Sequence, residues 1–237
     1  MSTGDELVEV GQPLGPGQIY NANSFGLAAQ VLEAGGLPLR LAPAPDTPEG
    51  LRDALRAAAD AADLVLTSGG VSVGDLDLVR QALEEAGHID FWRVAIKPGK
   101  PLAFGKLYGR SLIGLPGNPV SSHVCFELFA RPAIRALQGA TQPHRERRRL
   151  PLWAPLRAQG ARRELVRARL WRRDGQLGVE PLAKQGSGQL ASLLGLGALI
   201  DRLPEAPAAA VGDAVDAWIV GEEGFESLAL TRREPHA

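Results

Sequence analysis

The chain has 237 residues and a mass of 25.1 kDa, which allows one or two domains. Its 26 Lys and Arg residues nearly balance 27 Asp and Glu residues, so a globally basic nucleic-acid-binding protein is not expected. With 45% hydrophobic and 22% charged residues, the composition is typical of a globular chain and not of a disordered one. The single cysteine, Cys125, excludes an internal disulfide and any Cys₂ or Cys₄ metal site within one chain.

Targeting signals are not evident in the sequence. No apolar run reaches the ~18 residues that a membrane-spanning helix needs. The residues after Met1 include neither a basic segment nor an apolar segment of the kind that a signal peptide contains. We therefore expect a cytoplasmic protein with no membrane partner.

The first 139 residues alternate helical and strand patterns. Helices are predicted over 24–34, 47–62, 75–86 and 120–137, and strands over 37–42, 64–66, 91–96, 101–107 and 111–115. Thr47 followed by Pro48 is a helix-start pattern, and Pro132 predicts a kink or break in the last helix. Strands that alternate with helices imply an α/β fold of three layers around a mainly parallel sheet.

The pattern changes after Gly139. Residues 140–149 are polar and basic and are predicted to form a linker. From residue 150 the hydrophobic period becomes two, with strands expected over 164–171, 176–179, 198–203 and 214–220 and a hairpin turn at Asp174-Gly175. We therefore predict an α/β domain over 1–139 and a small all-β domain, barrel-like or sandwich-like, over 150–237.

Two loops are candidates for binding an anion. The glycine-rich segment Ser68–Asp75 lies between a strand and a helix, where backbone N–H groups and a helix N-terminus suit a phosphate. The alternative is a tight turn without a ligand.

Lys97 and Lys100 are two of only four lysines and flank one short proline-containing turn, which suits an oxyanion. The alternative is a solvated basic turn.

A third loop and a set of carboxylates add further candidates. The Pro116-Gly117-Asn118-Pro119 loop is stiff and offers an amide that can hydrogen-bond a heterocycle edge, or it is simply a rigid turn. Carboxylates that converge from several strand ends can hold Mg²⁺, which prefers oxygen ligands. The candidates are Asp5, Glu6, Asp46, Asp75 and Asp77. For Asp46, Asp75 and Asp77 the alternative is helix capping.

An arginine-rich stretch follows the linker. Arg145 and 147–149 precede a strand that bears Arg167 and Arg169, and tryptophans lie nearby. Single-stranded RNA binding by a small barrel would use such a surface. We favour a solvated, arginine-rich strand face and predict no nucleic-acid partner.

Five motifs taken together resemble one family, and they occur in family order at family-like spacing. They are Ser2-Thr3-Gly4-Asp5-Glu6-Leu7, the segment 17–23, the segment 68–74, Lys97-Pro98-Gly99-Lys100-Pro101, and the segment 115–121. The chain resembles the molybdopterin molybdenumtransferases, the MoeA family to which the gephyrin E domain is related. Residues 1–139 resemble the molybdopterin-binding domain shared with the MogA adenylyltransferases, and residues from about 145 onward are similar to the C-terminal β domain.

The resemblance implies that molybdate is inserted into adenylylated molybdopterin with release of AMP, with Mg²⁺ present, in a homodimer. It implies that the phosphate lies on Ser68, Gly69, Gly70, Ser72, Gly74 and Asp75. The pterin side would meet Asp77, Pro116, Gly117, Asn118 and Pro119. The metal and molybdate region would contain Asp5, Glu6 and Asp46. Lys97, Lys100 and Arg93 would neutralise anionic groups, Arg93 standing where relatives often have lysine. The catalytic roles would fall to Glu6, Asp46, Asp77 and Lys97.

The sequence also departs from the family. Family members have two further N-terminal domains and a central strand before the Thr-Gly-Asp-Glu-Leu motif, whereas here Met1 directly precedes Ser2. We therefore expect a fragment whose sheet lacks its first strand and which is weakly active or inactive alone. A MogA-like adenylyltransferase is an alternative, against which the β domain argues. A second alternative is a non-catalytic, gephyrin-like scaffold.

Overall fold

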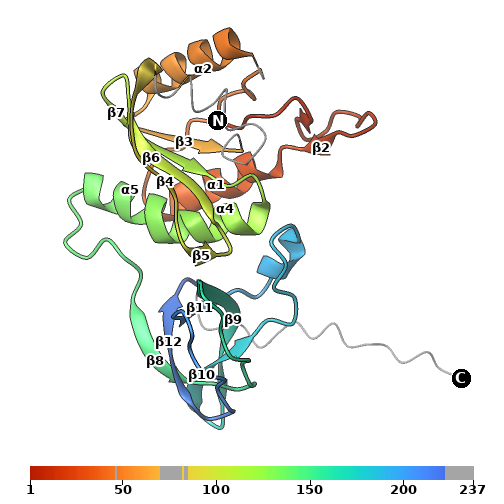
Figure 1. Ribbon diagram of the computed structural model, residues 1–237, viewed down its shortest axis with the longest axis vertical. Coiled ribbons are helices and arrows are strands. Elements are labelled where there is room, and N and C mark those ends of the chain that lie inside the picture. The colour runs from red at the N-terminus through yellow and green to blue at the C-terminus, as the bar shows by residue number, and fades with distance from the viewer. Residues whose placement is uncertain (46, 70–81, 83–84, 222–237) are drawn as a thin grey trace, which may run out of the picture. The chain divides into compact units, whose positions relative to one another are not determined.

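The computed structural model describes residues 1–45, 47–69, 82 and 85–221, with the backbone alone over 89–93. The chain divides into two compact units between His144 and Arg145, inside the segment 140–149 that was predicted to be a linker (Figure 1). Within the described ranges, no helix combines the length and apolar character that crossing a membrane requires.

The described part of the first unit contains several helical segments. These are α1 (Ala22–Glu33), α2 (Pro48–Ala61), α4 (Pro119–Cys125), the π-helix η1 (Phe126–Ala130) and α5 (Arg131–Leu137). Thr47 caps α2, since its Oγ1 accepts a hydrogen bond from the Gly50 N–H at 3.2 Å, and this confirms the predicted helix start. Of the predicted helix 75–86, only residues 82, 85 and 86 are described, and they are helical.

The central sheet of the first unit is mixed. Its strands are β3 (Leu64–Ser68), β7 (Arg110–Leu115), β6 (Pro101–Leu107) and β4 (Gly87–Arg93), and they lie side by side in that order. Strands β3 and β7 are parallel, whereas β7/β6 and β6/β4 are antiparallel. The α/β class is confirmed, but the described sheet is not mainly parallel, because β6 and β7 form a hairpin through Tyr108-Gly109 and a two-residue connection joins only antiparallel strands.

The described part of the first unit also contains a short two-stranded arm and one further short strand. Strands β1 (Leu7–Val8) and β2 (Ile19–Tyr20) pair in parallel, and β5 (Ile96–Lys97) follows β4. The predicted strand 37–42 is absent: none of these residues is assigned to a strand, and the bridge between Thr3 and Ala44 lies just beyond the segment. Leu37 is 95% exposed, so this apolar run lacks the burial that pairing within a sheet would give.

The long C-terminal helix of this unit passes through Pro132 without a break. Proline lacks an N–H and clashes with the carbonyl four residues earlier. The backbone widens into the π-helix Phe126–Ala130 immediately before α5, and the helical assignment continues through Pro132, so the predicted break does not occur. The helix therefore continues to Leu137.

The second unit is a closed β-barrel. Its strands are β8 (Arg147–Pro151), β9 (Arg163–Arg173), β10 (Gln176–Pro181), β11 (Ala198–Arg202) and β12 (Ala214–Ile219), with a short 3₁₀-helix η2 (Leu190–Leu193). Antiparallel pairing gives the order β10-β9-β11-β12-β8. A bridge between Leu152 and Val179, with a 2.8 Å bond from the Trp153 N–H to the Val179 carbonyl, joins the two ends. Closure leaves no free sheet edge at that point.

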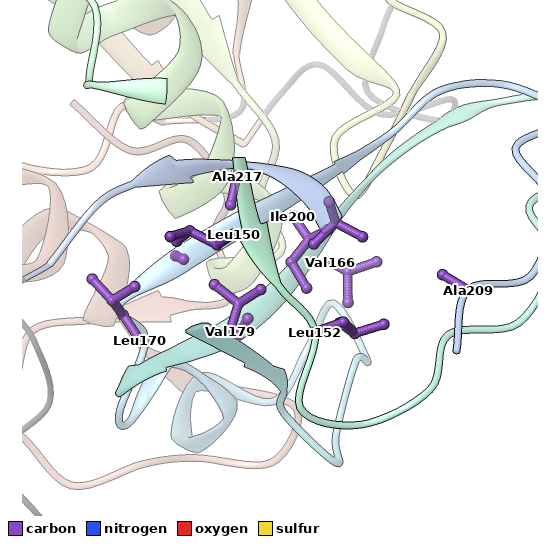
Figure 2. Close-up of a cluster of buried hydrophobic side chains, with 11 residues drawn as sticks. Leu150, Leu152, Val166, Leu170, Val179, Ile200, Ala209 and Ala217 are labelled. Atoms are coloured by element: carbon purple, nitrogen blue, oxygen red, sulfur yellow. The ribbon is translucent and has the colours of Figure 1, made fainter. Parts of the chain in front are cut away.

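The barrel core confirms the two-residue hydrophobic period. Val166, Ala168 and Leu170 of β9 belong to its buried cluster. Figure 2 shows Val166 and Leu170 among buried side chains from the other strands. The β9–β10 hairpin turns at Asp174 and Gly175, as predicted, and both residues have the positive φ angles, 51° and 80°, that a tight two-residue hairpin turn uses. Strand β8 begins at Arg147, within the segment predicted to be a linker.

Candidate functional site

Two predicted loops meet where β3 and β7 end. Because these strands are parallel neighbours, their carboxyl ends lie at the same edge of the sheet, where α/β proteins bind ligands. The Gly69 N–H donates to the Leu115 carbonyl at 3.2 Å. A Cβ atom placed on Gly117 would lie 3.5 Å from the Gly69 Cα atom. The structure therefore brings the predicted residues Ser68, Gly69 and Gly117 together.

Asn23 joins these two loops to α1. Its Nδ2 lies 2.8 Å from Ser68 Oγ and 2.7 Å from the Gly117 carbonyl oxygen. We call Asn23, Ser68, Gly69 and Gly117 the strand-end cluster. In the sequence Asn23 is only the last residue of the motif 17–23, and its bridging role was missed. The feature of the sequence that could have indicated this role is the polar run Asn21-Ala22-Asn23-Ser24 at the start of a helix.

The N-terminal residues pack against the same cluster. The Thr3 N–H donates to the Ser68 carbonyl at 3.2 Å, and the Thr3 side chain is buried with no hydrogen-bond partner for Oγ1 in the described part of the chain. Gly69 has a φ of 90°, and a Cβ atom there would approach the Thr3 carbonyl oxygen to 2.8 Å. Glycine is therefore required at position 69 both by its backbone angle and by the space available.

The Pro116–Pro119 loop supplies one exposed polar side chain. Pro116 is buried, while the Asn118 side chain is exposed and makes no cap hydrogen bond to α4. The Asn118 carbonyl accepts from the Ser122 N–H at 2.9 Å, which starts the helix. The loop is thus a rigid helix start that leaves the Asn118 amide accessible beside Gly117.

The lysine loop contacts the other end of α4. Lys97 and Lys100 are both exposed, and the Gly99 carbonyl between them accepts from Cys125 Sγ at 3.7 Å. Cys125 is the last residue of α4 and Pro119 is the first, so the two loops are anchored about 9 Å apart along the helix axis. Burial raises the pKa of the Cys125 thiol to about 12, which keeps the thiol protonated at neutral pH.

The predicted acidic cluster is only partly described. Asp5 and Glu6 are exposed, and the Glu6 carboxylate folds back over Gly4, at which a Cβ atom would lie 2.5 Å from Glu6 Oε2. Within the described ranges no three His, Cys, Asp or Glu side chains gather in a way that could hold a metal ion. Asp5 and Glu6 by themselves therefore do not form a metal site.

Several predicted site residues lie outside the described part of the chain. They are Asp46, Gly70, Ser72, Gly74, Asp75 and Asp77. The backbone of Arg93 pairs with Pro101 in the β4/β6 ladder, and its side chain is not described.

Arg167 in the barrel departs from the predicted solvated arginine face, whereas Arg169 on the same strand is exposed as predicted. The Arg167 side chain is fully buried, and Nη2 donates to the carbonyl oxygens of Lys184 and Gly186 at 3.0 and 3.2 Å. Its Nε and Nη1 have no partner among the described residues. Gln185 bonds both the N–H and the carbonyl of Arg167, so the chain that follows β10 folds over this strand face. Burial lowers the pKa of this guanidinium. No local pattern in the sequence signals this cover.

The observed architecture is a mixed α/β domain with ligand-type loops at its strand ends, followed by a closed β-barrel. Its first unit corresponds to the family described as "Probable molybdopterin binding domain", which matches residues 1–136, and its second to the "MoeA C-terminal region (domain IV)", which matches residues 149–220. Because the first match spans more than half of the chain, the protein belongs to the molybdopterin-binding domain family, and the second match gives it the domain pair of MoeA proteins.

Named relatives agree with this assignment. The chain is 49% identical over 149 residues to the molybdopterin molybdenumtransferase of Haemophilus influenzae. This alignment covers 60% of the chain and 35% of that protein. It is 37% identical over 225 residues to molybdopterin molybdenumtransferase 2 of Mycobacterium tuberculosis, covering 92% of the chain and 55% of that protein. A MoeA crystal structure from Pyrococcus horikoshii superposes with a TM-score of 0.77 at 30% identity, covering 92% of the chain and 52% of that structure. The chain thus spans about half or less of the length of these relatives.

Proposed function

We propose that this protein acts in molybdenum cofactor biosynthesis. It would bind adenylylated molybdopterin at the strand-end cluster and take part in the insertion of molybdate with release of AMP. Two observations support this: relatives covering most of the chain are named molybdopterin molybdenumtransferases, and Asn23 ties Ser68 and Gly117 together at the sheet edge. The second observation carries the proposal, because it shows preorganised polar groups at one place.

The cluster offers groups suited to an anionic heterocyclic ligand. A hydroxyl has one donor and two acceptor sites, and Ser68 Oγ already accepts from Asn23. Its own O–H would donate to a phosphate oxygen of the bound substrate. The exposed Asn118 amide, next to Gly117, can hydrogen-bond the pterin edge. These residues would position the substrate, and positioning is a large part of catalysis for such reactions.

The remaining features of the proposal come from the family resemblance. Lys97 and Lys100 would neutralise phosphate or molybdate charge, and the protein would work as a cytoplasmic homodimer. Mg²⁺ would need Asp46, or another ligand, in addition to Asp5 and Glu6, because the described carboxylates do not form a metal site by themselves. When bound, the metal would polarise phosphoryl oxygens. We assign no reaction step to it.

The proposal is tested by titrating adenylylated molybdopterin into the 237-residue chain and by measuring molybdate-dependent AMP release. We expect saturable binding, with weak turnover or none from this chain alone. Ser68→Ala should weaken binding about 10-fold or more, as expected for a lost hydrogen bond to a charged group. Ser111→Ala is the matched control, because Ser111 lies opposite Leu64 at the other end of the same strand pair. Equal binding by the two variants, or no binding by the unaltered chain, would contradict the proposal.

A further inference from the structure

A network of polar side chains fixes the arm formed by β1 and β2 to the start of α1. The Asn21 side chain is buried; its Nδ2 donates to Glu9 Oε1 at 3.2 Å, and its Oδ1 accepts from Ser2 Oγ at 2.8 Å. The other Glu9 oxygen, Oε2, accepts from Arg40 Nη2 at 2.9 Å. Ser24 Oγ accepts from the same Arg40 nitrogen at 3.1 Å and donates to the Asn21 carbonyl at 3.0 Å. Four of these residues thus form a closed ring of hydrogen bonds.

One branch of this ring reaches the strand-end cluster. Ser2 pairs with Ser68 through a parallel bridge, and the residues on either side of Ser2 hydrogen-bond to the Ser68 backbone at 3.0 and 3.2 Å. Ser2 and Asn21 are 2% and 1% exposed, so water does not compete for the bond between their side chains. Two side-chain hydrogen bonds therefore connect Glu9 to the residue that pairs with Ser68.

The ring also determines where the root of the arm lies. The Asn21 N–H donates to the Val8 carbonyl, and the Ile19 N–H donates to the Glu6 carbonyl, both at 2.9 Å. These bonds belong to the ladder in which β1 and β2 pair. Because Glu9 follows Val8 directly, its carboxylate closes this end of the ladder onto the Asn21 side chain. Glu6 lies at the other end of the same ladder.

The contribution of Glu9 lies in geometry more than in charge. The Glu9 and Arg40 side chains are 44% and 35% exposed, so solvent screens the attraction between them. The bond from Asn21 to Glu9 differs, because a buried amide that loses its acceptor also loses the benefit of its orientation. The Arg40 guanidinium lies 3.6 Å over the Phe25 ring, which holds it in place where it meets Glu9.

We propose that Glu9 is a positioning residue for the substrate site. Through Asn21 it keeps the Ser68 strand end in register with the arm that carries Glu6. Groups that are held in place before binding lower the ordering cost when a substrate arrives. Glu9 acts through Asn21 and not by contact with the substrate. This inference rests on the proposed function, which assigns substrate binding to the strand-end cluster.

The first test measures the binding of adenylylated molybdopterin to variants of the 237-residue chain. Glu9→Ala removes the acceptor of Asn21 and should weaken binding about 10-fold. Glu9→Gln keeps an oxygen that accepts from Asn21 and should bind within about 2-fold of the unaltered chain. Glu49→Ala is the matched control and should not change binding, because Glu49 forms a similar exposed pair with Arg52 at 3.2 Å on α2. A purely stabilising role would lower the melting temperature of Glu9→Ala and leave the affinity of the folded chain unchanged, which would overturn the proposal.

A second measurement does not involve the substrate. In Glu9→Ala the amides of Ile19 and Asn21 should exchange their hydrogens about 10-fold faster or more, because the ladder that binds them is no longer closed. The amides within the β3/β7 pair should exchange at their original rates. Unaltered exchange at Ile19 and Asn21 would overturn the role of Glu9 whether or not the substrate binds. Failure of the unaltered chain to bind the substrate would instead contradict the proposed function, and this inference with it.

Discussion

Asn23 and Ser68 are 45 residues apart in the sequence, yet the Asn23 Nδ2 atom lies 2.8 Å from the Ser68 Oγ atom. The same nitrogen lies 2.7 Å from the carbonyl oxygen of Gly117, a further 49 residues along the chain. One side-chain amide thus connects the start of α1, the end of β3 and the loop after β7. Since both of its N–H groups have acceptors, the amide orientation is determined by the structure.

Replacing this donor by an acceptor should destabilise the first unit. Asn23→Asp keeps the side-chain size but turns a carboxylate toward the Ser68 hydroxyl and the Gly117 carbonyl, so at least one acceptor loses its donor. We expect a loss of about 2 kcal/mol in the free energy of unfolding, measured by urea denaturation. Asn118→Asp, at an exposed position without a side-chain cap bond, should change stability by less than about 0.5 kcal/mol. Equal losses in the two variants would contradict the bridging role of Asn23.

Gly69 provides a second test of the cluster. Gly69→Ala adds a Cβ atom 2.8 Å from the Thr3 carbonyl oxygen, on a residue whose φ is 90°. Gly11→Ala is the matched control, because Gly11 has a φ of 97° and no atom within 4 Å of an added Cβ. The control should lose about 1 kcal/mol from backbone strain alone, and Gly69→Ala should lose more. Comparison of their thermal unfolding separates the steric effect from the backbone effect, and equal losses would show that Thr3 moves away without cost.

Local rules account for the parts of the fold that were predicted correctly. The Thr47-Pro48 helix start and the Asp174-Gly175 turn depend on residues close in sequence, and both were confirmed. The period of two around Val166 identified the β-domain because each strand buries one face.

The errors arise where distant residues decide the outcome. The apolar run 37–42 has strand composition but forms no ladder with a neighbouring strand, and β8 begins within a polar segment because β12 offers it a complete ladder. Arg167 is buried because the chain around Gln185 folds over it. Asn23 could be recognised as a bridge only when β3 and β7 were placed side by side.

An ion pair in the barrel whose carboxylate is inaccessible should contribute more to stability than a pair whose two side chains are both exposed. The Asp201 carboxylate is inaccessible, and its two oxygens accept from Arg163 Nε and Nη2 at 2.7 and 2.6 Å, an arrangement that raises the pKa of Arg163. Asp201→Ala removes this pairing and also the acceptor for Trp218 Nε1. We expect a loss of about 2 kcal/mol in unfolding free energy, as for the loss of hydrogen bonds to a charged group, because the Arg163 left behind is partly exposed to solvent.

The matched control for the ion pair is Glu146→Ala. Glu146 forms a comparable two-oxygen pair with Arg148 at 2.7 and 2.9 Å, but both side chains are about half exposed. Solvent screens such pairs, so no measurable change in stability is expected. Similar effects in the two variants would show that burial does not determine the contribution of these pairs.

The buried thiol of Cys125 predicts a loss of stability at alkaline pH. In the folded protein its pKa is raised to about 12, compared with 9.0 for an accessible thiol. Above pH 9 the unfolded chain therefore releases a proton that the folded chain retains, and linkage then favours unfolding. This contribution is absent below pH 9, increases by up to about 1.4 kcal/mol per pH unit, and levels off above about pH 12. In Cys125→Ala this component should vanish, so the two proteins should differ in the slope of stability against pH between 9 and 11.

The same burial should protect Cys125 from thiol reagents at pH 8 until the chain unfolds, and rapid labelling of the native protein would show that the thiol is accessible.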